Sequence, residues 1–344
     1  MTARGARSAL VVAAIAALAA VGLADAGLPA VAGQADPAEQ LLSGARRAAE
    51  EHDFAGVLEV TWSDGSGSRS QEVPVSNTGG VLALGDEGQV VVEGPRRFVH
   101  ETQGWFAVWS SQDQPAAPSP SEKWELRMRD GPVVAGRVTR EVEAADRAQG
   151  RVRERFYFDA STGILLRREQ LDRHGDTVRA VGFVRIGDTP GELFGVVPAD
   201  APRAPLGSVA RQPQSIDSVG APFRAPGSAG DGFRLAGRYR DADGTVQLFY
   251  SDGLFGVSVF EQEGELDWSG LPEGEARTVG DHDARQYRTP TGVVTVWQSG
   301  DVVYTAVADA PVDQLDEVLA DFAPSDSPSA LERVTTFVLG PFSW

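Results

Sequence analysis

The spacing of apolar residues changes from a helical to an extended pattern near residue 53. Residues 36–39 (Asp-Pro-Ala-Glu) place an N-cap, a proline at the first helical position and an acidic residue in the first turn. Small and apolar residues then recur on one face of a helix, at Leu41, Ala45, Ala48 and Ala49. The pattern therefore predicts a helix over residues 36–51.

From Phe54 onward apolar residues alternate with polar ones, which is typical of strands. After a first strand at residues 54–62, the same pattern predicts strands at residues 89–92, 97–101, 105–110, 124–129 and 132–142. Residues 151–186 contain three more strands, joined by turns at residues 159–163 and 174–176. Together these strands predict one antiparallel sheet, curved or partly closed, with the helix over one face.

A proline-rich stretch precedes a second set of strands. Seven prolines lie between residues 190 and 226, a density that disfavours strand pairing and favours an interdomain connection. Later alternating segments predict strands at residues 233–238, 245–250, 254–261, 284–288, 293–298 and 302–307. Residues 310–322 predict a covering helix. The predicted fold is α+β and mostly β: an N-terminal half-open antiparallel β-barrel with a covering helix, and a smaller C-terminal antiparallel sheet with one helix.

The predicted organisation has five parts. Residues 1–32 form a signal peptide, residues 33–190 the N-terminal domain and residues 191–230 the proline-rich linker. Residues 231–324 form the C-terminal domain, and residues 325–344 a tail. An apolar run in the tail is suited to docking onto a domain or a partner.

The first thirty residues have the pattern of an export signal. Arg4 and Arg7 precede an uncharged apolar run at residues 9–23. That run of about 15 residues is short for a membrane span, and a small-x-small site favours cleavage after Ala32. An uncleaved anchor that extends through Ala24 is the alternative. We expect the protein outside the cytoplasm, in the periplasm, in the cell envelope or secreted.

Composition narrows the functional classes. The formal net charge of −18 opposes binding to nucleic acid, whose phosphates require a clustered basic surface. The chain has no cysteine, so an exported protein of this sequence depends on packed cores rather than on disulfides. The same absence excludes a thiol nucleophile and a cysteine-based zinc site.

The sequence shows no set of residues with the spacing of a catalytic centre. The histidines have no partner at metal-ligand spacing; they are His52, His100, His174 and His282. His282 lies between two aspartates, which fits either a weak metal site or a solvated turn. Residues 65–68 (Gly-Ser-Gly-Ser) lack the strand-to-helix setting of a hydrolase nucleophile. We therefore expect a protein that is not an enzyme and has no cofactor.

Large apolar residues concentrate in the predicted N-terminal strands. Two interpretations are open: these side chains fill an ordinary core, or they line a cavity of a curved sheet that holds an acyl chain or an apolar peptide segment. The candidate cavity residues are Leu58, Val60, Trp62, Trp105, Trp109 and Phe156.

Two stretches carry distinctive turn motifs. Residues 155–169 (RFYFDASTGILLRRE) form a strand-turn-strand pattern, and residues 248–260 (LFYSDGLFGVSVF) form a hairpin. Asp-Gly between alternating strands is a strong hairpin signal. Both stretches resemble proteins of the MucB/RseB family of sigma-factor regulators, in whose second domain a Tyr-Ser-Asp-Gly-Leu turn joins two strands.

The resemblance implies both a fold and a function. It implies an N-terminal domain shaped like the lipoprotein carriers LolA and LolB, with a hydrophobic cavity, and a smaller C-terminal domain. Members of this family bind the extracytoplasmic part of a membrane anti-sigma factor and shield it from proteolysis in envelope stress signalling, with lipid signals releasing it. We therefore expect a non-catalytic regulator with an anti-sigma factor partner and a lipid as a further ligand. A LolA-like lipid or lipoprotein carrier of the cell envelope is the alternative.

A cleft between the two domains is the preferred partner site, because a semi-rigid linker would hold two domains side by side. The hairpin that matches the family's second domain is the candidate wall of this cleft. Its candidate partner-binding residues are Tyr250, Ser251, Asp252 and Gly253. The alternative is that Asp252 and Gly253 only make a tight turn.

Overall fold

The computed structural model describes most of the chain between residues 36 and 322. The described residues are 36–63, 65–78, 81–84, 90–93, 97–101, 104–108, 118–187, 214–240, 244–289 and 292–322. The predicted signal peptide and the predicted tail lie outside these ranges.

The first large sheet is antiparallel throughout. Eight of the described strands form it, in the order β3-β2-β1-β11-β10-β9-β8-β7. They are β1 (Phe54–Ser63), β2 (Ser68–Thr78), β3 (Val81–Leu84), β7 (Trp124–Asp130), β8 (Thr139–Asp146), β9 (Val152–Asp159), β10 (Leu165–Leu171) and β11 (Thr177–Gly187). Strand β1 pairs with β11, so the beginning and the end of the N-terminal strand sequence meet in the middle of the sheet.

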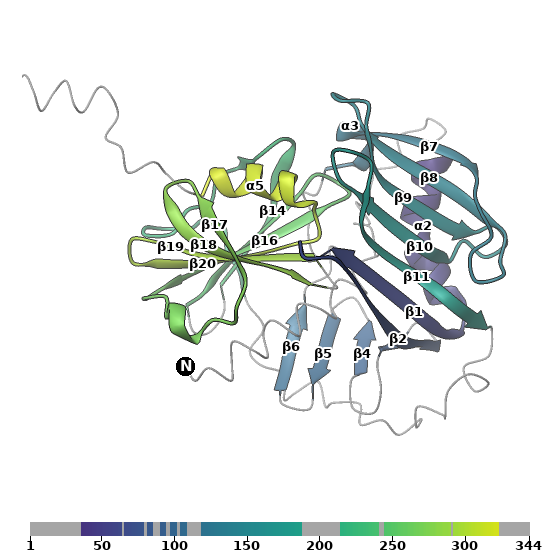
Figure 1. Ribbon diagram of the computed structural model, residues 1–344, viewed down its shortest axis with the longest axis horizontal. Coiled ribbons are helices and arrows are strands. Elements are labelled where there is room, and N and C mark those ends of the chain that lie inside the picture. Colours follow the sequence, from purple (N-terminus) through teal and green to yellow (C-terminus); the bar gives the residue numbers. More distant parts are fainter. Residues whose placement is uncertain are drawn as a thin grey trace, which may run out of the picture.

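Helix α2 (Pro37–Glu51) begins where the sequence predicts it. The Asp36 carboxylate accepts a hydrogen bond from the Ala38 N–H at 2.8 Å and caps the first turn. Leu42 and Ala45 are buried in the same apolar cluster as Phe156 of β9. In Figure 1 the helix runs across one face of the sheet behind strands β7 to β10. The predicted sheet with a covering helix is confirmed.

Aspartates close the two predicted turns between β9, β10 and β11. Asp159 accepts backbone N–H hydrogen bonds from Ser161 and Thr162, and Asp172 accepts them from His174 and Asp176. Burial would raise the pKa of Asp159, but hydrogen bonds, first among them that from Arg137, lower the pKa to about 2. The two hairpins at residues 151–186 therefore form as the sequence predicts.

The predicted strand at residues 132–142 is wrong in its first half. Val134 and Arg137 exchange two backbone hydrogen bonds around a tight turn. The two residues between them, Ala135 and Gly136, have φ values of 49° and 82°, the backbone shape of a two-residue hairpin loop. Strand β8 therefore begins only at Thr139.

A small sheet lies beside the first one. It contains, among the described residues, three strands in the order β4-β5-β6. They are β4 (Val90–Glu93), β5 (Arg97–Glu101) and β6 (Gly104–Val108). The predicted meander in this part of the chain is thus present, as a separate sheet. After it, the short helix α3 (Pro120–Lys123) leads into β7.

The second domain is built on another antiparallel sheet. Its described strands run in the order β12-β14-β15-β16-β20-β19-β18-β17, and β13 also pairs with β14. They are β12 (Gln214–Ser215), β13 (Ser228–Ala229), β14 (Phe233–Arg240), β15 (Val246–Ser251), β16 (Gly256–Glu263), β17 (Glu275–Val279), β18 (His282–Thr289), β19 (Gly292–Ser299) and β20 (Val302–Ala308). Because β12 and β13 lie within the range predicted as linker, the sheet of the second domain begins before residue 231.

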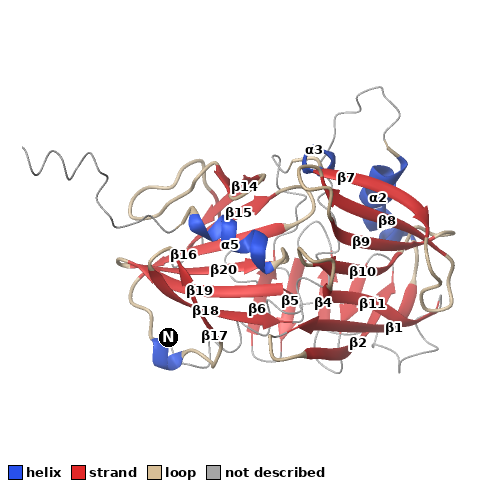
Figure 2. Cartoon of the chain, turned by 45° about the horizontal axis from the view of Figure 1, so that its top comes forward, coloured by secondary structure: helices blue, strands red, loops and turns tan. Residues whose placement is uncertain are grey.

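Helix α5 (Val312–Ala320) covers one face of this second sheet, and the 3-10 turn η2 (Trp268–Gly270) precedes β17. Leu315 and Val318 of the helix are fully buried. Beneath it the Trp297 and Tyr304 rings stack with their centroids 4.9 Å apart. The predicted second domain, a sheet with one covering helix, is confirmed in outline (Figure 2).

The two domains share one apolar core. Trp124 and Phe156 of the first domain belong to the same buried cluster as Phe255 and Val257 of the second. The predicted fold class, mostly β with two antiparallel sheets, is therefore confirmed, and the domains are packed against each other. None of the helices among the described residues is long and apolar enough to cross a membrane.

Candidate binding site between the two domains

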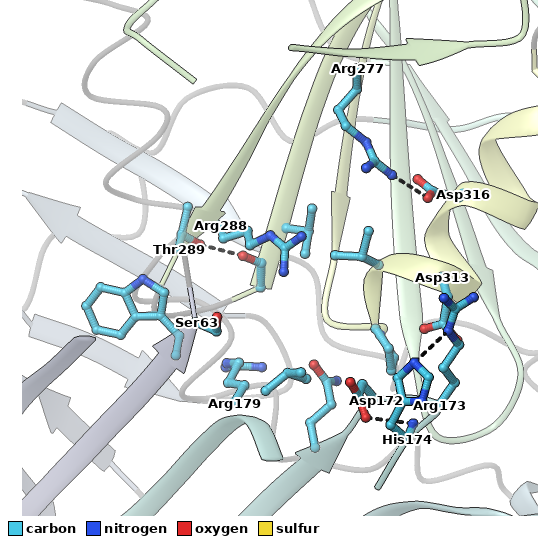
Figure 3. Close-up of a pocket in the computed structure, with 17 residues that line it drawn as sticks. Ser63, Asp172, Arg173, His174, Arg179, Arg277, Arg288, Thr289, Asp313 and Asp316 are labelled. Atoms are coloured by element: carbon cyan, nitrogen blue, oxygen red, sulfur yellow. Dashed lines mark hydrogen bonds and ion pairs between the residues drawn. The ribbon is translucent and has the colours of Figure 1, made fainter. Parts of the chain in front are cut away.

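A cavity of about 440 Å³ lies between the domains (Figure 3). The first domain contributes the end of β1, the end of β10, the β10–β11 turn and the beginning of β11. The second domain contributes residues of β17, β18 and β19 and the beginning of α5. The walls therefore come from two sets of segments that lie at least 98 positions apart in the sequence, the distance from Arg179 to Arg277.

The first contact between the domains centres on Lys123, the only lysine of the chain. Its Nζ lies 3.2 Å from Oδ2 of Asp252, which is fully buried, and donates a hydrogen bond to the Asp231 carbonyl at 2.6 Å. The ammonium group also lies 5.1 Å from the ring centroids of Trp124 and Phe233. Burial raises the pKa of Asp252, and the charge of Lys123 opposes that rise.

Close apolar packing surrounds this ion pair. The Trp124 and Phe255 rings meet edge to face, with their centroids 5.4 Å apart. Gly253 has a φ of 94°, and a Cβ on it would lie 2.6 Å from the backbone nitrogen of Pro120. Only glycine fits there. We call this set the aromatic contact: Lys123, Trp124, Asp252, Gly253 and Phe255.

The second contact is built from charged groups. Arg168 donates from Nε to the Glu154 carboxylate, and its Nη1 lies 3.3 Å from Oδ2 of Asp309 in the second domain. Gln170 donates to the Asp309 backbone carbonyl. The other carboxylate oxygen of Asp309 accepts the Gly256 N–H at 2.6 Å, which fixes the position of Asp309.

Arg153 extends this contact to helix α5. Its Nη2 lies 2.7 Å and 2.9 Å from the two carboxylate oxygens of Asp313, and its Nε donates to the Leu171 carbonyl. Only 3% of the Arg153 side chain is exposed, so the arginine is fixed by both partners. We call this set the charged contact: Arg153, Glu154, Arg168, Gln170, Asp309 and Asp313.

Burial shifts the pKa values of the groups at the charged contact. Burial raises the pKa of Glu154 to about 7, although the charge of Arg168 opposes the rise. Arg179, which is buried and borders the cavity, has its pKa lowered to about 10, first by burial and then by repulsion from Arg168. Asp309 and Glu154 act in the opposite direction on Arg179 without reversing the shift.

The predicted partner-binding residues lie inside the molecule. Tyr250 is fully buried, packs edge to face on Phe322 with centroids 5.6 Å apart, and donates to the Pro226 carbonyl at 2.8 Å. Ser251 and Asp252 are also buried. The hairpin therefore does not present an open wall of a cleft, because Tyr250 packs inside its own domain and the first domain covers Asp252 and Gly253. Partner binding by these residues stays a prediction.

The predicted cavity residues are divided between two places. Leu58, Val60 and Phe156 are buried in apolar clusters, as the ordinary-core interpretation expects. Trp62 is half-buried and borders the cavity between the domains. The side chain of Trp105 and the whole of Trp109 lie outside the described residues.

Several residues of the cavity were not predicted. Arg179, Arg277, Arg288 and Asp313 each lie in a strand or helix where a charged residue is the ordinary solvent-facing choice. Nothing in their local sequence marks them. Their role depends on the docking of one domain on the other, which a local pattern does not contain.

Two of the four histidines, His174 and His282, lie at turns next to strands. His174 lies in the β10–β11 turn, where Arg173 donates to its Nε2 at 3.1 Å. His282 begins β18 directly after a tight turn. Among the described residues, no three His, Asp or Glu side chains gather in a way that would hold a metal ion.

The fold and the cavity define a two-domain, mostly β protein with a charged cavity between its domains. No family model matches the chain, and no curated protein matches it either. Solved structures similar to it are those of MucB, whose family the sequence resembles, and of LolA superfamily proteins.

The similarities are distant. The Pseudomonas aeruginosa MucA/MucB complex has 20% identity over 83% of this chain and 97% of the other, with a TM-score of 0.47. A crystal structure of MucB has 17% identity over 82% and 96%, with a TM-score of 0.43. The LolA superfamily protein NE2245 from Nitrosomonas europaea has 7% identity over 80% and 92%, with a TM-score of 0.19. What this chain does therefore has to follow from its own residues.

Proposed function

We propose that the protein is a non-catalytic, extracytoplasmic regulator that binds the extracytoplasmic domain of a membrane anti-sigma factor and modulates its proteolysis. The observation that supports this most is the cavity of about 440 Å³ whose walls come from both domains. At a site formed by both domains, the affinity for a ligand depends on the relative position of the domains.

The partner is taken from the sequence resemblance. Residues 248–260 resemble the second-domain hairpin of MucB/RseB regulators, and the chain uses this hairpin to dock its own two domains at Asp252 and Gly253. The hairpin therefore helps to hold the two domains together, and the cavity lies between those domains. The same resemblance implies a lipid signal that releases the partner.

Export is part of the proposal. Arg4 and Arg7 followed by the apolar run at residues 9–23 support a location outside the cytoplasm, where the extracytoplasmic domain of a membrane protein is accessible.

The test is direct binding. The chain from residue 33 is titrated by calorimetry with the purified extracytoplasmic domain of a single-span anti-sigma factor from the same genome, and that domain is then digested with a protease. We expect a 1:1 complex with a Kd in the micromolar range or tighter, about −8 kcal/mol, and slower digestion in the complex. A domain that neither binds nor gains protection would contradict the proposal.

A second outcome separates regulation from transport. If native mass spectrometry of the purified protein finds one bound lipid per chain, and no anti-sigma factor domain binds, the LolA-like carrier function becomes the better proposal. A lipid that lowers the affinity for the bound domain would instead support the lipid-released regulator.

A further inference from the structure

Strand β17 is an outer strand of the second sheet and has an open edge. Among the described strands it pairs with β18 alone, and in Figure 2 it lies at the lower edge of that sheet. Val279 and His282 pair on either side of a two-residue turn, and such a turn is closed by a hydrogen-bonded pair. Because hydrogen bonds alternate along an antiparallel strand, the backbone N–H and C=O groups of Ala276 and Thr278 point away from β18.

These backbone groups are available to a ligand. Ala276 and Thr278 are both exposed, and no described residue outside β18 forms a hydrogen bond with their backbone. Two N–H and two C=O groups therefore lie in a row with the spacing of a strand. Another extended chain presents donors and acceptors with the same spacing, so the open edge favours an extended peptide segment as its ligand.

The charged side chains of β17 are engaged within their own domain. Arg277 pairs with Asp316 of helix α5 at 2.6 Å, and Glu275 lies 3.4 Å from Arg277 and 3.6 Å from Arg288 of β18. These ion pairs lie on the face of the sheet that α5 covers. The opposite face of β17 carries only an alanine and a threonine. The edge therefore lacks the solvated charges that usually protect an outer strand from pairing.

Strand β7, at one edge of the first sheet, differs in this respect. Its charged side chains stay about half exposed: Glu125 at 46%, Arg127 at 54% and Arg129 at 56%. An added strand would have to displace or desolvate these charges. β7 therefore has the protection expected of an edge that stays unpaired, and it provides a control for β17.

An exposed tryptophan lies on the uncovered face near β17. Ala276 pairs with Arg285 of β18, so their side chains share the face opposite to α5. The Arg285 guanidinium group lies 5.7 Å from the Trp268 ring centroid, and Arg285 donates to the Trp268 carbonyl at 3.3 Å. Trp268 is one of the few exposed large apolar side chains among the described residues. Since Ala276 has a small side chain, it covers little of the surface between the free edge and this ring.

The open edge also lies close to the first domain. A Cβ on Gly65, in the turn between β1 and β2, would lie 4.0 Å from a carboxylate oxygen of Glu275. Trp62 and Ser63 at the end of β1 border the same cavity as Arg277 of β17. A segment added to β17 would therefore lie near both domains, and its affinity would depend on their relative position.

We propose that the open edge of β17 binds an extended segment of the protein partner by strand addition, with backbone hydrogen bonds to Ala276 and Thr278 and an apolar side chain directed toward Trp268. The inference rests on the proposed function, since it assumes a protein partner. It adds the conformation of the segment that is recognised and the residues that recognise it.

The first test is whether a bound segment pairs as a strand. A phage library of random 12-residue peptides is selected on the full exported chain, and each enriched peptide is synthesised with a single N-methyl group at successive positions. Alternate N–H groups of a paired strand face β17. We therefore expect the Kd to rise at least tenfold, about 1.4 kcal/mol, at every second position and to change little between them. A library without an enriched peptide, or losses that do not alternate, would overturn the proposal.

The second test changes the edge itself. Thr278→Pro removes an N–H group that β18 does not use, and proline is tolerated at such a position of an edge strand, so thermal melting should show a folded protein. We expect its Kd for the enriched peptides to rise at least tenfold. Trp268→Ala is expected to weaken peptides that carry an apolar side chain.

The matched control is Met128→Pro. The Gly131 N–H donates to the Thr139 carbonyl, and the register of β7 with β8 is regular, so alternation directs the Met128 N–H away from β8. This variant also loses an outward N–H group, but on the protected edge, and should bind the peptides as tightly as the parent. Equal affinity of Thr278→Pro and the parent would overturn the proposal, and unchanged affinity of Trp268→Ala would overturn its apolar part.

Further outcomes separate this inference from its alternatives. If sedimentation of the exported chain alone shows a dimer that Thr278→Pro abolishes, the edge pairs with a second copy and the assignment to a partner segment is wrong. If the anti-sigma factor domain binds Thr278→Pro as tightly as the parent, this inference fails and the proposed function stands. If enriched peptides pair with β17 and no such domain binds, the proposed function fails and the strand-addition site stands.

Discussion

The aromatic contact and the charged contact join the same two domains with different chemistry. In the aromatic contact the buried ion pair Lys123–Asp252 lies among packed rings. In the charged contact Arg168 is shared between Glu154 of its own domain and Asp309 of the other. The candidate binding cavity borders the charged contact, since Gln170 and Asp313 belong to both.

This difference in chemistry indicates which of the two contacts can respond to pH or to a ligand. Packing of rings depends on shape and is nearly insensitive to pH and salt, whereas a buried ion network depends on the protonation of each member. Glu154, with its pKa raised to about 7 by burial, changes charge in the neutral pH range. The aromatic contact therefore holds the two domains together. The charged contact is where a ligand or a change of pH can alter the relative position of the domains.

The largest expected effect comes from breaking the aromatic contact at Gly253. In Gly253→Ala the new Cβ lies 2.6 Å and 2.7 Å from backbone atoms of Pro120, which side-chain rotation does not relieve. The φ of 94° adds backbone strain. We expect a loss of about 4 kcal/mol in the free energy of unfolding, measured by urea denaturation.

The matched control is Gly244→Ala. Gly244 has the same φ of 94° but nothing within 4 Å of its Cβ position, so it should lose only the strain, about 1 kcal/mol. Acylation of Lys123, the only lysine side chain, reports on opening of the contact. Equal losses in the two variants would show that Gly253 does not contact the first domain in solution.

The next effect comes from the charged contact. Arg168→Met leaves the buried Glu154 without its arginine and removes the ion pair to Asp309. We expect a loss of about 3 kcal/mol near pH 8. The loss should be smaller near pH 6, where Glu154 takes up a proton. The double variant with Glu154→Gln should recover part of the loss, because the buried carboxylate that has lost its arginine is then replaced by a neutral amide. A double variant that is less stable than Arg168→Met would contradict this account.

Local sequence patterns predicted the elements that have strong local signals. The helix α2 has a cap and an apolar face, and the hairpins around Asp159 and Asp252 have turn residues between alternating strands. The strands β2 (Ser68–Thr78) and β17 (Glu275–Val279) were not predicted. Both are rich in polar residues, because their places at or near a sheet edge leave much of each strand exposed.

The site was predicted only in part, for a different reason. The sequence identified Trp62 and the turn at Asp252 as candidates, but it did not predict which part of the other domain each of them would contact. Asp252 is fully buried because Lys123, 129 positions earlier, docks on it. Arg277 and Arg288 became candidates only when the cavity brought them together with Arg179. Contacts between domains are not encoded in the period of any single strand.

A smaller effect follows from two of the buried glutamates, Glu154 and Glu261. Burial raises the pKa of both Glu154 and Glu261 to about 7. An unfolded glutamate ionises near pH 4, so the folded protein holds more protons between the two values. The stability from this source is present at low pH and is lost as the pH rises through about 7. We expect the free energy of unfolding to fall by about 1 kcal/mol per group from about pH 6 to about pH 8.

The variant Glu261→Gln measures the part of the pH dependence of stability that comes from Glu261. The Gln oxygen can still accept the Arg224 N–H that Glu261 accepts at 2.9 Å. Denaturation of the variant at both pH values should show about 1 kcal/mol less pH dependence than the parent. Glu263→Gln, an exposed position of the same strand, should leave the dependence unchanged. A parent whose stability rises over this range would show that other groups dominate.

The smallest expected effect compares two arginines that pair with aspartates of helix α5. Arg277 pairs with Asp316 at 2.6 Å, and both side chains are about one-third or more exposed; such pairs contribute under about 0.5 kcal/mol. Arg277→Gln should therefore melt within about 2 °C of the parent. Arg153 is instead buried at 3% exposure and bonds both carboxylate oxygens of Asp313, so Arg153→Gln should cost about 3 kcal/mol. A large drop in the melting temperature of Arg277→Gln would show that Arg277 belongs to the charged contact instead.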